Sequence, residues 1–405
     1  MPQSYIGFPQ ALKLTLAGVR PLTPEMRALA DGLDAVAAED IYATVDSPSA
    51  PTSLKDGYAV RSSDIAGASA EHPVRLVVTG GKAAAGAPKR ENVPAGAAVR
   101  ILTGGRLPQQ ADTVVAEEFA GLADDGIVVD QALAAGRNVL PQGTDVASGE
   151  KVAAAGDRLT PGRLGLIAAA GRARIRVHRN PRVAVIATGD EVRLPGTPLA
   201  QGQLYASNAV TLEAWCRRFN CATVLTIVPD RRETLLAALQ RAVQTCDAVL
   251  TSGGAWSGER DLVRQALEEL RWQLVFHRIR LGPGKGTGMG LVGQCPVFML
   301  PGGPPANLVG FLKLALPALR KMGGHQDAGL PRQHVRLERE VRGRQGWTQA
   351  VFGNILVNGE GRRLFQPDRQ ASRLKSIGQA QALLTIPEGI DHMAAGLAVE
   401  VEVLA

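Results

Sequence analysis

The sequence predicts a multi-domain protein of α/β and β structure, centred on a doubly wound parallel sheet. Three short apolar runs in the middle of the chain each break into a tight turn of small residues. Such runs are typical of fully buried parallel strands with helices crossing back between them. Ligands bind these sheets at the carboxyl ends of the strands, and here the turns also contain acidic residues. Turns that combine small residues with carboxylates indicate an anionic ligand held through a divalent cation. The runs and turns are VAVIA-TGDE at 183–191, AVL-TSGG at 248–254 and VFML-PGGP at 297–304.

Composition narrows the classes of protein that fit. The chain has 405 residues, too many for one ordinary core, and 45% of them are hydrophobic. We expect neither a membrane span nor a secretion signal, because there is no run of 18 apolar residues and no charged and apolar leader. The four cysteines show no CxxC spacing, which predicts free buried thiols in a reducing cytoplasm. The net charge of +7 with only 4% aromatic residues favours an anionic small molecule over nucleic acid.

The N-terminal part of the chain has a helical pattern from Phe8 to Tyr42, broken at Pro21 and Pro24. Thr23 followed by Pro24 is a regular helix start, because threonine caps the first turn and proline fits its first position. We therefore expect a second helix to begin at this point.

Residues 43–145 change character and are predicted to be mostly β. Short apolar runs alternate with glycine turns, which is the pattern of short strands. A linker-like stretch over 146–180 follows, with a helix expected at 161–170. The strands of the β-rich segment are expected at 74–78, 98–102, 112–115 and 126–129.

The α/β domain is expected over residues 181–324, and the tail over 325–405 returns to short strands. The tail contains alternating basic and apolar residues at 334–339, as on a solvated face of a sheet. We interpret it as a small β-barrel or sandwich. Its further strands are expected at 348–352, 383–386 and 398–404.

Candidate acidic residues stand in the turns after the buried strands. Asp190 and Glu191 are adjacent carboxylates that could bind Mg²⁺ or a ligand hydroxyl. The alternative is that one caps the next element and the other is solvated. Asp230 opens a helix expected to run to Thr245 and precedes Glu233 by three residues, so a capping box is the alternative to a site role.

Two glycine-rich turns could bind an anion through backbone N–H groups. Gly253 and Gly254 precede a helix whose N-terminal dipole favours negative charge, and Asp261 lies in its first turn. The loop 281–290 contains Lys285, a point charge suited to a phosphate. This loop lacks the ending of a Walker motif, and a glycine-rich hairpin is its alternative.

Two further carboxylates lie in the β-rich part. Asp56 stands in SLKDGYAV after a proline-marked loop, and Asp145 stands in GTDV. A loop carboxylate beside glycine is commonly a turn former, which is the alternative to a site role for both.

Taken in order, these segments resemble the MoeA family, the molybdopterin molybdenumtransferases, over nearly the whole chain. One such motif would be weak, but the same order at matching spacings is strong, because context confirms a motif. The motifs are DGYAV at 56–60, RILTGG at 100–105, ADTVV at 111–115, ATGDEV at 187–192, PGTPL at 195–199, SGG at 252–254 with Glu259 and Asp261, PGK at 283–285 and LPG at 300–302.

The resemblance implies four domains and an elongated homodimer. These are a discontinuous connecting domain (23–42 and 146–180), a β-rich domain (43–145), an α/β molybdopterin-binding domain (1–22 and 181–324) and a C-terminal β domain (325–405). It also implies an enzyme that inserts molybdate, or tungstate, into adenylylated molybdopterin with Mg²⁺ and releases AMP. A molybdopterin adenylyltransferase and client molybdo- or tungstoenzymes are implied partners.

The resemblance also implies site residues. A site that brings two anions together must neutralise charge, which Mg²⁺ held by carboxylates can do. The positions that match the family's catalytic residues are Asp56, Asp145, Glu191 and Asp261. Of these, the resemblance implies that Asp56, Glu191 and Asp261 bind the metal. Asp56 and Asp145 would reach the cleft from the partner subunit. The positions that would bind the pterin substrate are Thr188, Gly189, Asp190, Asp230, Ser252, Gly253, Gly254, Ser257, Lys285, Pro301, Gly302 and Pro304.

Several positions depart from the family pattern and predict a divergent paralogue. Gly282 stands where the family has a lysine, Gly303 where it has asparagine, and Trp256 where it has serine. The remaining departures are Leu54, Lys55, Ala255, Gly286 and Thr287. Such a paralogue could insert tungstate, use a modified pterin, or bind without turnover as a carrier or scaffold. An unrelated Mg²⁺-dependent nucleotide enzyme on a doubly wound sheet is a third hypothesis.

Overall fold

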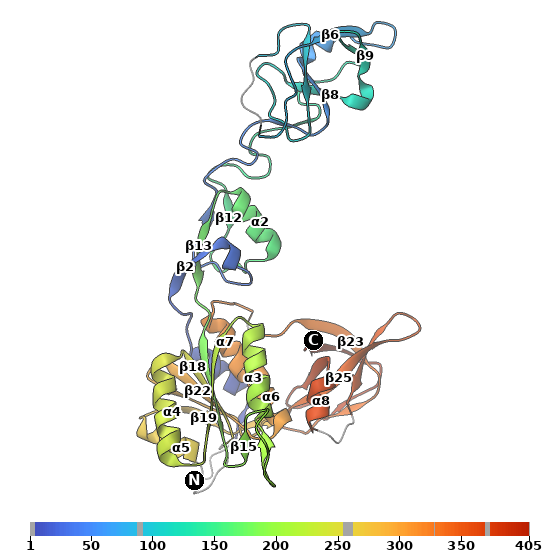
Figure 1. The fold of residues 1–405 in the computed structure, drawn as a ribbon. Helices are drawn as coiled ribbons and strands as arrows, with labels where there is room; N and C mark the ends of the chain where they lie inside the picture. The colour runs from blue at the N-terminus through green and yellow to red at the C-terminus, as the bar shows by residue number, and fades with distance from the viewer. Residues whose placement is uncertain (1–4, 87–91, 254–261, 328, 369–372, 405) are drawn as a thin grey trace. The chain divides into compact units, whose positions relative to one another are not determined.

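The computed structural model describes the chain except residues 1–4, 87–91, 254–261, 328, 369–372 and 405 (Figure 1). The chain forms two compact units. Unit 1 comprises Met1–Glu25 and His178–Ala405, and unit 2 comprises Met26–Val177. The finer division into four domains stays a prediction.

Unit 1 contains the predicted doubly wound sheet. Strands β14, β17, β18 and β22 pair in parallel, while β21 and β19 extend the sheet antiparallel at one edge. The prediction of parallel strands is therefore confirmed at all three apolar runs. In spatial order the strands are β17 (Ala222–Val228), β14 (Arg182–Thr188), β18 (Ala248–Ser252), β22 (Cys295–Leu300), β21 (Gly288–Val292) and β19 (Gln273–His277).

The sheet is buried on both faces, because alternate residues of each strand enter different cores. Val183 and Val185 of β14 pack with α3 (Ser207–Arg218) and with the helices after β22. Ala184 and Ile186 pack instead with α4 (Arg232–Thr245) and α5 (Leu262–Glu269) on the opposite face (Figure 1). Residues buried on both faces explain why these strands appear as continuous apolar runs in the sequence.

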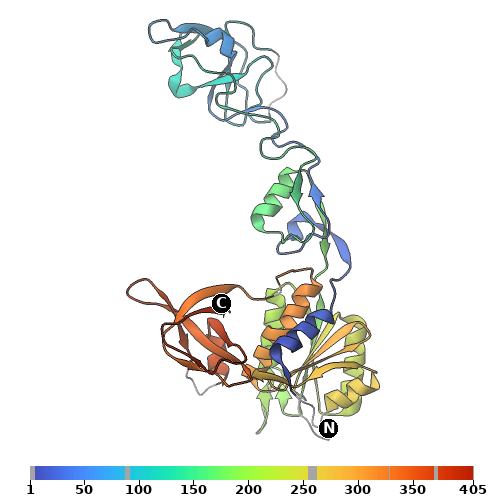
Figure 2. The same cartoon turned by 180° about the vertical axis from the view of Figure 1, so that it is seen from behind.

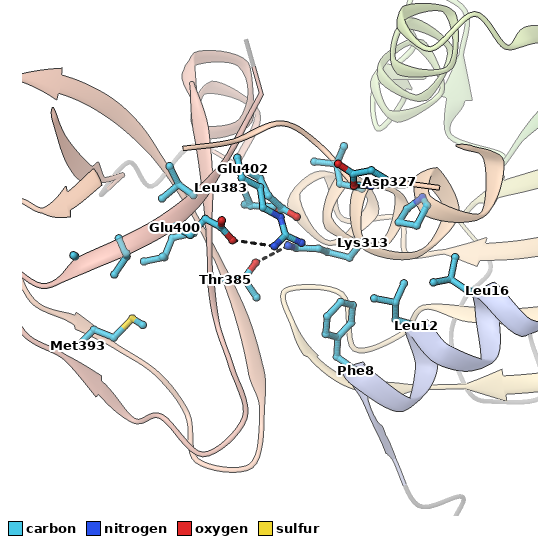
Figure 3. A pocket seen from close by; sticks show the side chains of 18 of the residues that line it. Phe8, Leu12, Leu16, Lys313, Asp327, Leu383, Thr385, Met393, Glu400 and Glu402 are labelled. Carbon is cyan, nitrogen blue, oxygen red and sulfur yellow. Dashed lines mark hydrogen bonds and ion pairs between the residues drawn. The ribbon is translucent and has the colours of Figure 1, made fainter. Parts of the chain in front are cut away.

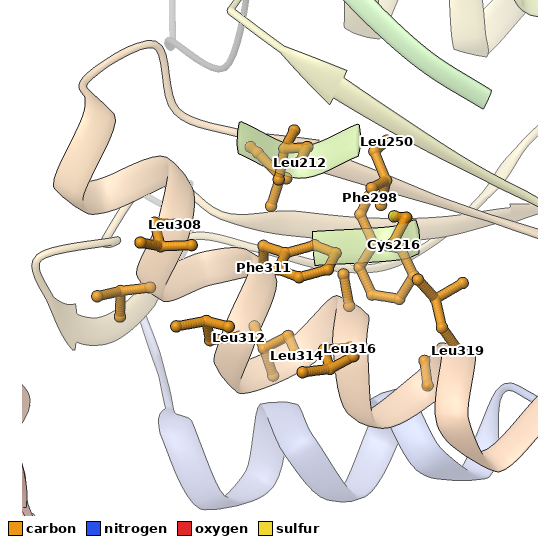
Figure 4. Packing of buried hydrophobic residues seen from close by; sticks show 14 of the residues in the cluster. Leu212, Cys216, Leu250, Phe298, Leu308, Phe311, Leu312, Leu314, Leu316 and Leu319 are labelled. Carbon is orange, nitrogen blue, oxygen red and sulfur yellow. The ribbon is translucent and has the colours of Figure 1, made fainter. Parts of the chain in front are cut away.

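The helical run after β22 closes the larger core. It comprises α6 (Pro304–Gly310), a π-helical turn η4 (Phe311–Ala315) and α7 (Leu316–Met322). Its apolar side chains meet Leu212 and Cys216 of α3 and Leu250 and Phe298 of the sheet (Figure 4). Helix α1 (Phe8–Ala17) lies beside this run (Figure 2). All four cysteines of the chain are buried free thiols, as expected.

The C-terminal part of unit 1 is a small closed barrel. Its seven-stranded sheet runs in the order β1, β20, β25, β26, β23, β29, β27, and an additional pairing of β25 with β27 closes it. Helix α8 (Arg373–Gln379) packs against it. The strands are β1 (Ile6–Gly7), β20 (Ile279–Gly282), β23 (Arg332–Leu337), β25 (Thr348–Val357), β26 (Arg363–Pro367), β27 (Ala382–Ile386) and β29 (Ala398–Val403), with β24 (Val341–Arg342) and β28 (His392–Met393) as a separate pair.

A buried lysine joins the barrel to the helices of unit 1. Lys313 of η4 donates to Thr385 Oγ1 of β27 at 2.5 Å and forms an ion pair with Glu402 of β29. A pocket of about 580 Å³ opens beside this pair, with Phe8 and Leu12 of α1 on its apolar side (Figure 3). Burial lowers the pKa of Lys313, while Glu402 acts in the opposite direction.

Unit 2 is mostly β, as predicted, and the expected strands agree with the observed ones to within one residue at their ends. Three two-stranded ribbons accompany the main sheet: β11 (Val139–Leu140) with β4 (Thr52–Ser53), β12 (Lys151–Ala153) with β3 (Ile41–Tyr42), and β13 (Arg174–His178) with β2 (Pro24–Ala28). The main sheet runs β8 (Thr113–Ala116), β5 (Gly57–Val60), β7 (Ala97–Ile101), β6 (Val74–Val78), β10 (Gly126–Val129), β9 (Gly121–Ala123).

The helical pattern expected from Phe8 is confirmed by α1, whereas the helices expected at Pro24 and at 161–170 have opposite outcomes. Helix α2 (Pro161–Ala169) is confirmed, and the Thr160 side chain accepts from the Arg163 N–H as its cap. The helix expected at Pro24 is wrong, because Pro24–Ala28 pairs as β2 with β13 and only a short 3₁₀ turn, η1 (Leu29–Asp31), follows. Pairing with a strand far along the chain overrides the local capping signal, which carries about 1 kcal/mol.

Candidate functional site

The turns at the carboxyl ends of β14, β18 and β22 surround one pocket of unit 1. The pocket has a volume of about 720 Å³. Of the predicted residues, it brings together Thr188, Glu191, Ser252, Gly253, Gly302 and Pro304. Its position agrees with the rule that open α/β sheets bind ligands beyond the carboxyl ends of their strands.

Close backbone approach explains the glycine after β18. Gly253 has a φ of +100°, and its N–H donates to the Leu300 carbonyl oxygen at 3.2 Å. A Cβ atom at this position would lie 2.7 Å from the Thr188 carbonyl oxygen. The turn therefore requires glycine both for its left-handed conformation and for its contact with the end of β14.

Hydrogen bonds tie Asp230 to the turn after β14. Thr188 Oγ1 donates to Asp230 Oδ1 at 2.5 Å, and the Asp230 N–H donates to Asp190 Oδ1 at 3.1 Å. Helix α4 has Arg231 at its N-cap and no side-chain cap. The capping box that we considered for Asp230 is thus not formed, since its carboxylate is engaged by Thr188 instead.

Glu191 is exposed and borders the pocket. Its carboxylate lies over Gly189, where a Cβ atom would be 2.7 Å from Glu191 Oε2. In the described parts of the chain no group of three or more His, Cys, Asp or Glu side chains is suited to a metal. Mg²⁺ usually needs only one or two carboxylates plus substrate phosphates, so Glu191 and the adjacent Asp190 in the turn after β14 fit this ion.

A second pocket of about 540 Å³ lies beside the glycine loop and shares Gly303 with the first. Lys285, Arg278 and Arg344 line it, and Arg344 stacks over Trp347 at 4.4 Å from the ring centroid. Within the described residues these three cations form no ion pair with a carboxylate. The hairpin alternative for the loop is confirmed as geometry, because the loop connects β19 and β21, which pair antiparallel, and the Arg278 N–H donates to the Thr287 carbonyl oxygen at 3.1 Å. The same loop lines the second pocket, so the hairpin does not exclude a role in binding.

Sequence reasoning missed five residues that lie in or beside the two pockets. Arg373 of α8 lines the first pocket, and its Nη1 atom lies 3.9 Å from where a Gly303 Cβ would be. Arginines and asparagines inside helical or strand patterns are ordinary surface residues, so no local signal marks them. The five are Arg278 and Arg344 in the second pocket, Arg373 in the first, and Asn208 and Asn307 beside Ser252.

Other predicted residues lie elsewhere. Pro301 lines the second pocket. Asp56 and Asp145 belong to unit 2 and are exposed, and their place in a cleft shared with a partner stays a prediction. Gly254, Ser257 and Asp261 lie outside the described residues, as do Ala255, Trp256 and Glu259.

Asp56 is held by the loop that follows β7. Its Oδ1 atom accepts from the Thr103 N–H at 2.7 Å and from Thr103 Oγ1 at 2.9 Å. These two hydrogen bonds, aided by Arg100 and Lys82, lower the pKa of Asp56. The neighbouring Gly57 allows close strand contact, since a Cβ atom there would be 2.0 Å from the Val115 carbonyl oxygen.

The titration of Asp56 tests this arrangement. Hydrogen bonds to a carboxylate favour its charged form, so Thr103→Val should raise the pKa of Asp56 part of the way back toward 3.8. The measurement is a carboxyl-carbon NMR titration of Asp56 in the two proteins. Ser63→Ala is the control and should leave that midpoint unchanged; an unchanged midpoint in Thr103→Val would contradict the contact.

Comparison with known proteins identifies the family of this chain. Residues 6–171 match a family described as the MoeA N-terminal region, domains I and II, and residues 184–321 match a probable molybdopterin binding domain. The chain is 32% identical over 399 residues to molybdopterin molybdenumtransferase 2 of Mycobacterium tuberculosis, covering 94% of this chain and 95% of the relative. It is 33% identical over 409 residues to the molybdopterin molybdenumtransferase of Synechococcus elongatus, covering 98% and 100%.

A solved structure shows the same fold. A structure of the molybdopterin biosynthesis MoeA protein of Pyrococcus horikoshii superposes with a TM-score of 0.82 at 31% identity, covering 99% of each chain. The fold, the glycine turns and these matches define the class, a protein of molybdenum cofactor biosynthesis. The chain belongs to the MoeA family. None of the helices in the described residues is long and apolar enough to cross a membrane.

Proposed function

We propose that this protein is a molybdopterin molybdenumtransferase, which inserts molybdate, or tungstate, into adenylylated molybdopterin with Mg²⁺ and releases AMP. The relatives named above are called molybdopterin molybdenumtransferases. The observation that carries the proposal is the pair of pockets meeting at Gly303. Glu191 lines the first pocket, and the second is lined by three cations that form no ion pair with a carboxylate among the described residues. The two substrates, molybdate and adenylylated molybdopterin, are both anions, so the reaction needs a metal-binding pocket and a cationic pocket next to each other.

The first pocket suits the pyrophosphate of the adenylylated pterin. Mg²⁺ would be held by Glu191, with Asp190 and Asp230 beside it, and by Asp56 and Asp261 as the family resemblance implies. When bound, it would act as a Lewis acid on the phosphate oxygens. The N–H groups of the turns and the Ser252 hydroxyl would orient the phosphates, while Thr188 holds the Asp230 carboxylate in place.

The second pocket suits a tetrahedral oxyanion. Lys285 and Arg278 line it from the connection between β19 and β21, and Arg344 lines it from the turn after β24. The two arginines would supply the positive charge that the family lysine provides at the position of Gly282. Lys285→Met should raise the molybdate concentration for half-maximal rate about 10-fold, because hydrogen bonds to charged groups contribute roughly 1.5–3 kcal/mol. Steady-state titration with molybdate measures this; Lys375→Met on α8 is the control, and an unaltered molybdate dependence would refute the assignment.

The site is proposed to be completed by a homodimer in the cytoplasm. The carboxylates Asp56 and Asp145 would come from the partner subunit's unit 2. The four free thiols, three of which have their pKa raised by burial, agree with a reducing compartment. A molybdopterin adenylyltransferase as supplier and molybdo- or tungstoenzymes as clients are the implied partners.

Release of AMP tests the proposal directly. The protein is incubated with adenylylated molybdopterin and molybdate or tungstate, and AMP is followed by chromatography. We expect release that depends on Mg²⁺ and stops when a chelator is added. Tight binding with the adenylate left intact would instead support the carrier or scaffold hypothesis.

A further inference from the structure

Two asparagines converge on the hydroxyl of Ser252. Asn307 Nδ2 lies 3.1 Å from Ser252 Oγ, and Asn208 Nδ2 lies 3.3 Å from it. Asn307 stands in α6 and is 1% exposed, while Asn208 stands in α3. The serine itself, at the end of β18, is 6% exposed and borders the first pocket.

The direction of both hydrogen bonds follows from the second contact of each amide. Asn307 Nδ2 also lies 2.9 Å from the Pro301 carbonyl oxygen, and Asn208 Nδ2 lies 2.8 Å from the Gly302 carbonyl oxygen. A carbonyl oxygen can only accept, so the atom facing it must be the amide nitrogen. Each NH₂ group therefore donates one hydrogen to a carbonyl and the other to Ser252 Oγ.

These donors occupy both lone pairs of the Ser252 oxygen and leave its hydrogen for another acceptor. Among the described residues, the Ser252 hydroxyl donates no hydrogen bond. We infer that Asn208 and Asn307 are positioning residues that make Ser252 an obligate donor toward an anionic oxygen in the first pocket. This inference rests on the proposed function, which puts the phosphate oxygens of the substrate there.

The same geometry accounts for a departure from the family pattern. Gly303 lacks the side chain that the family has at this turn, and Asn307 stands four residues later, one helical turn along α6. The Asn307 side-chain amide donates one hydrogen bond to the Pro301 carbonyl oxygen, in the turn, and a second one to Ser252 Oγ. The amide function is thus supplied from α6, while Gly303 leaves room beside Arg373.

A double-mutant cycle tests the inference by calorimetric binding of inorganic pyrophosphate in the presence of Mg²⁺. S252A should weaken binding about 10-fold or more, because a hydrogen bond to a charged group is lost. N307A should weaken binding about 2- to 10-fold in the wild-type background and less than about 2-fold in the S252A background. A purely structural role for Asn307 would weaken binding equally in both backgrounds.

N208A can replace N307A in the same double-mutant cycle, because Asn208 also donates to Ser252 Oγ. It is used if circular dichroism shows that N307A does not fold. S376A on α8 is the matched serine control and should bind as the wild type does. Equal affinity of S252A and wild type, or no coupling in either cycle, overturns the inference. Wild-type protein that binds pyrophosphate but releases no AMP would sink the proposed function and leave the inference standing.

Discussion

Glu191→Gln is expected to lower the rate of AMP release by about 10²- to 10³-fold, the loss typical of removing one group that stabilises charge in the reaction. Glutamine keeps the size of the side chain but removes the negative charge that would hold Mg²⁺ at the first pocket. Because Glu191 is exposed and no hydrogen bond to its carboxylate is described, folding should be unaffected. The rate is measured with saturating Mg²⁺, and thermal unfolding verifies the fold.

Glu233→Gln is the matched control, since Glu233 is an exposed glutamate at the start of α4. It should release AMP at the wild-type rate. Full activity of Glu191→Gln would remove Glu191 from the metal site. A large rate loss in both variants would point to a general effect of charge.

Mixing two inactive variants tests whether the site is shared. Asp56→Asn in unit 2 and Glu191→Gln in unit 1 should each be inactive alone. If the site combines unit 1 of one subunit with unit 2 of its partner, random exchange of subunits returns about a quarter of the wild-type activity, because half of the dimers are mixed and each has one intact site. No recovery after verified exchange would mean that both carboxylates serve the same subunit.

Lys313→Ala should reduce the free energy of unfolding of unit 1 by about 3–5 kcal/mol. The lysine side chain is 7% exposed and pairs with Glu402, which is 15% exposed, so truncation leaves a carboxylate buried without its cation (Figure 3). The variant also enlarges an existing pocket between α1 and the barrel. Urea unfolding followed by tryptophan fluorescence measures the loss.

The double variant Lys313→Met with Glu402→Leu separates charge from packing. Replacing a buried ion pair by apolar residues is commonly neutral or stabilising, so this protein should unfold close to the wild-type urea concentration. Arg362→Ala breaks an ion pair whose side chains are 67% and 66% exposed and should cost less than about 1 kcal/mol. Equal losses for Lys313→Ala and Arg362→Ala would contradict the stabilising role of the buried pair.

The strands of the α/β sheet could be predicted from the sequence because burial on both faces requires consecutive apolar residues in each strand. Val183 and Ala184 enter different cores, so both must be apolar, and the run is visible without any knowledge of its neighbours. The strand at Pro24 could not be predicted, because its partner β13 comes about 150 residues later in the sequence, after the whole β-rich segment. Local capping signals are weaker than a long-range ladder of backbone hydrogen bonds.

The candidate site divides in the same way. The sequence by itself determined the order of motifs, the glycine turns after the strands and the acidic residues within them, because turn geometry and strand burial restrict residue types locally. Only the tertiary structure showed that Thr188 engages Asp230, that Asn208 and Asn307 share the Ser252 hydroxyl, and that Arg373 faces Gly303. These side chains meet across separate elements, and a hydrogen bond between distant residues restricts neither one's local pattern.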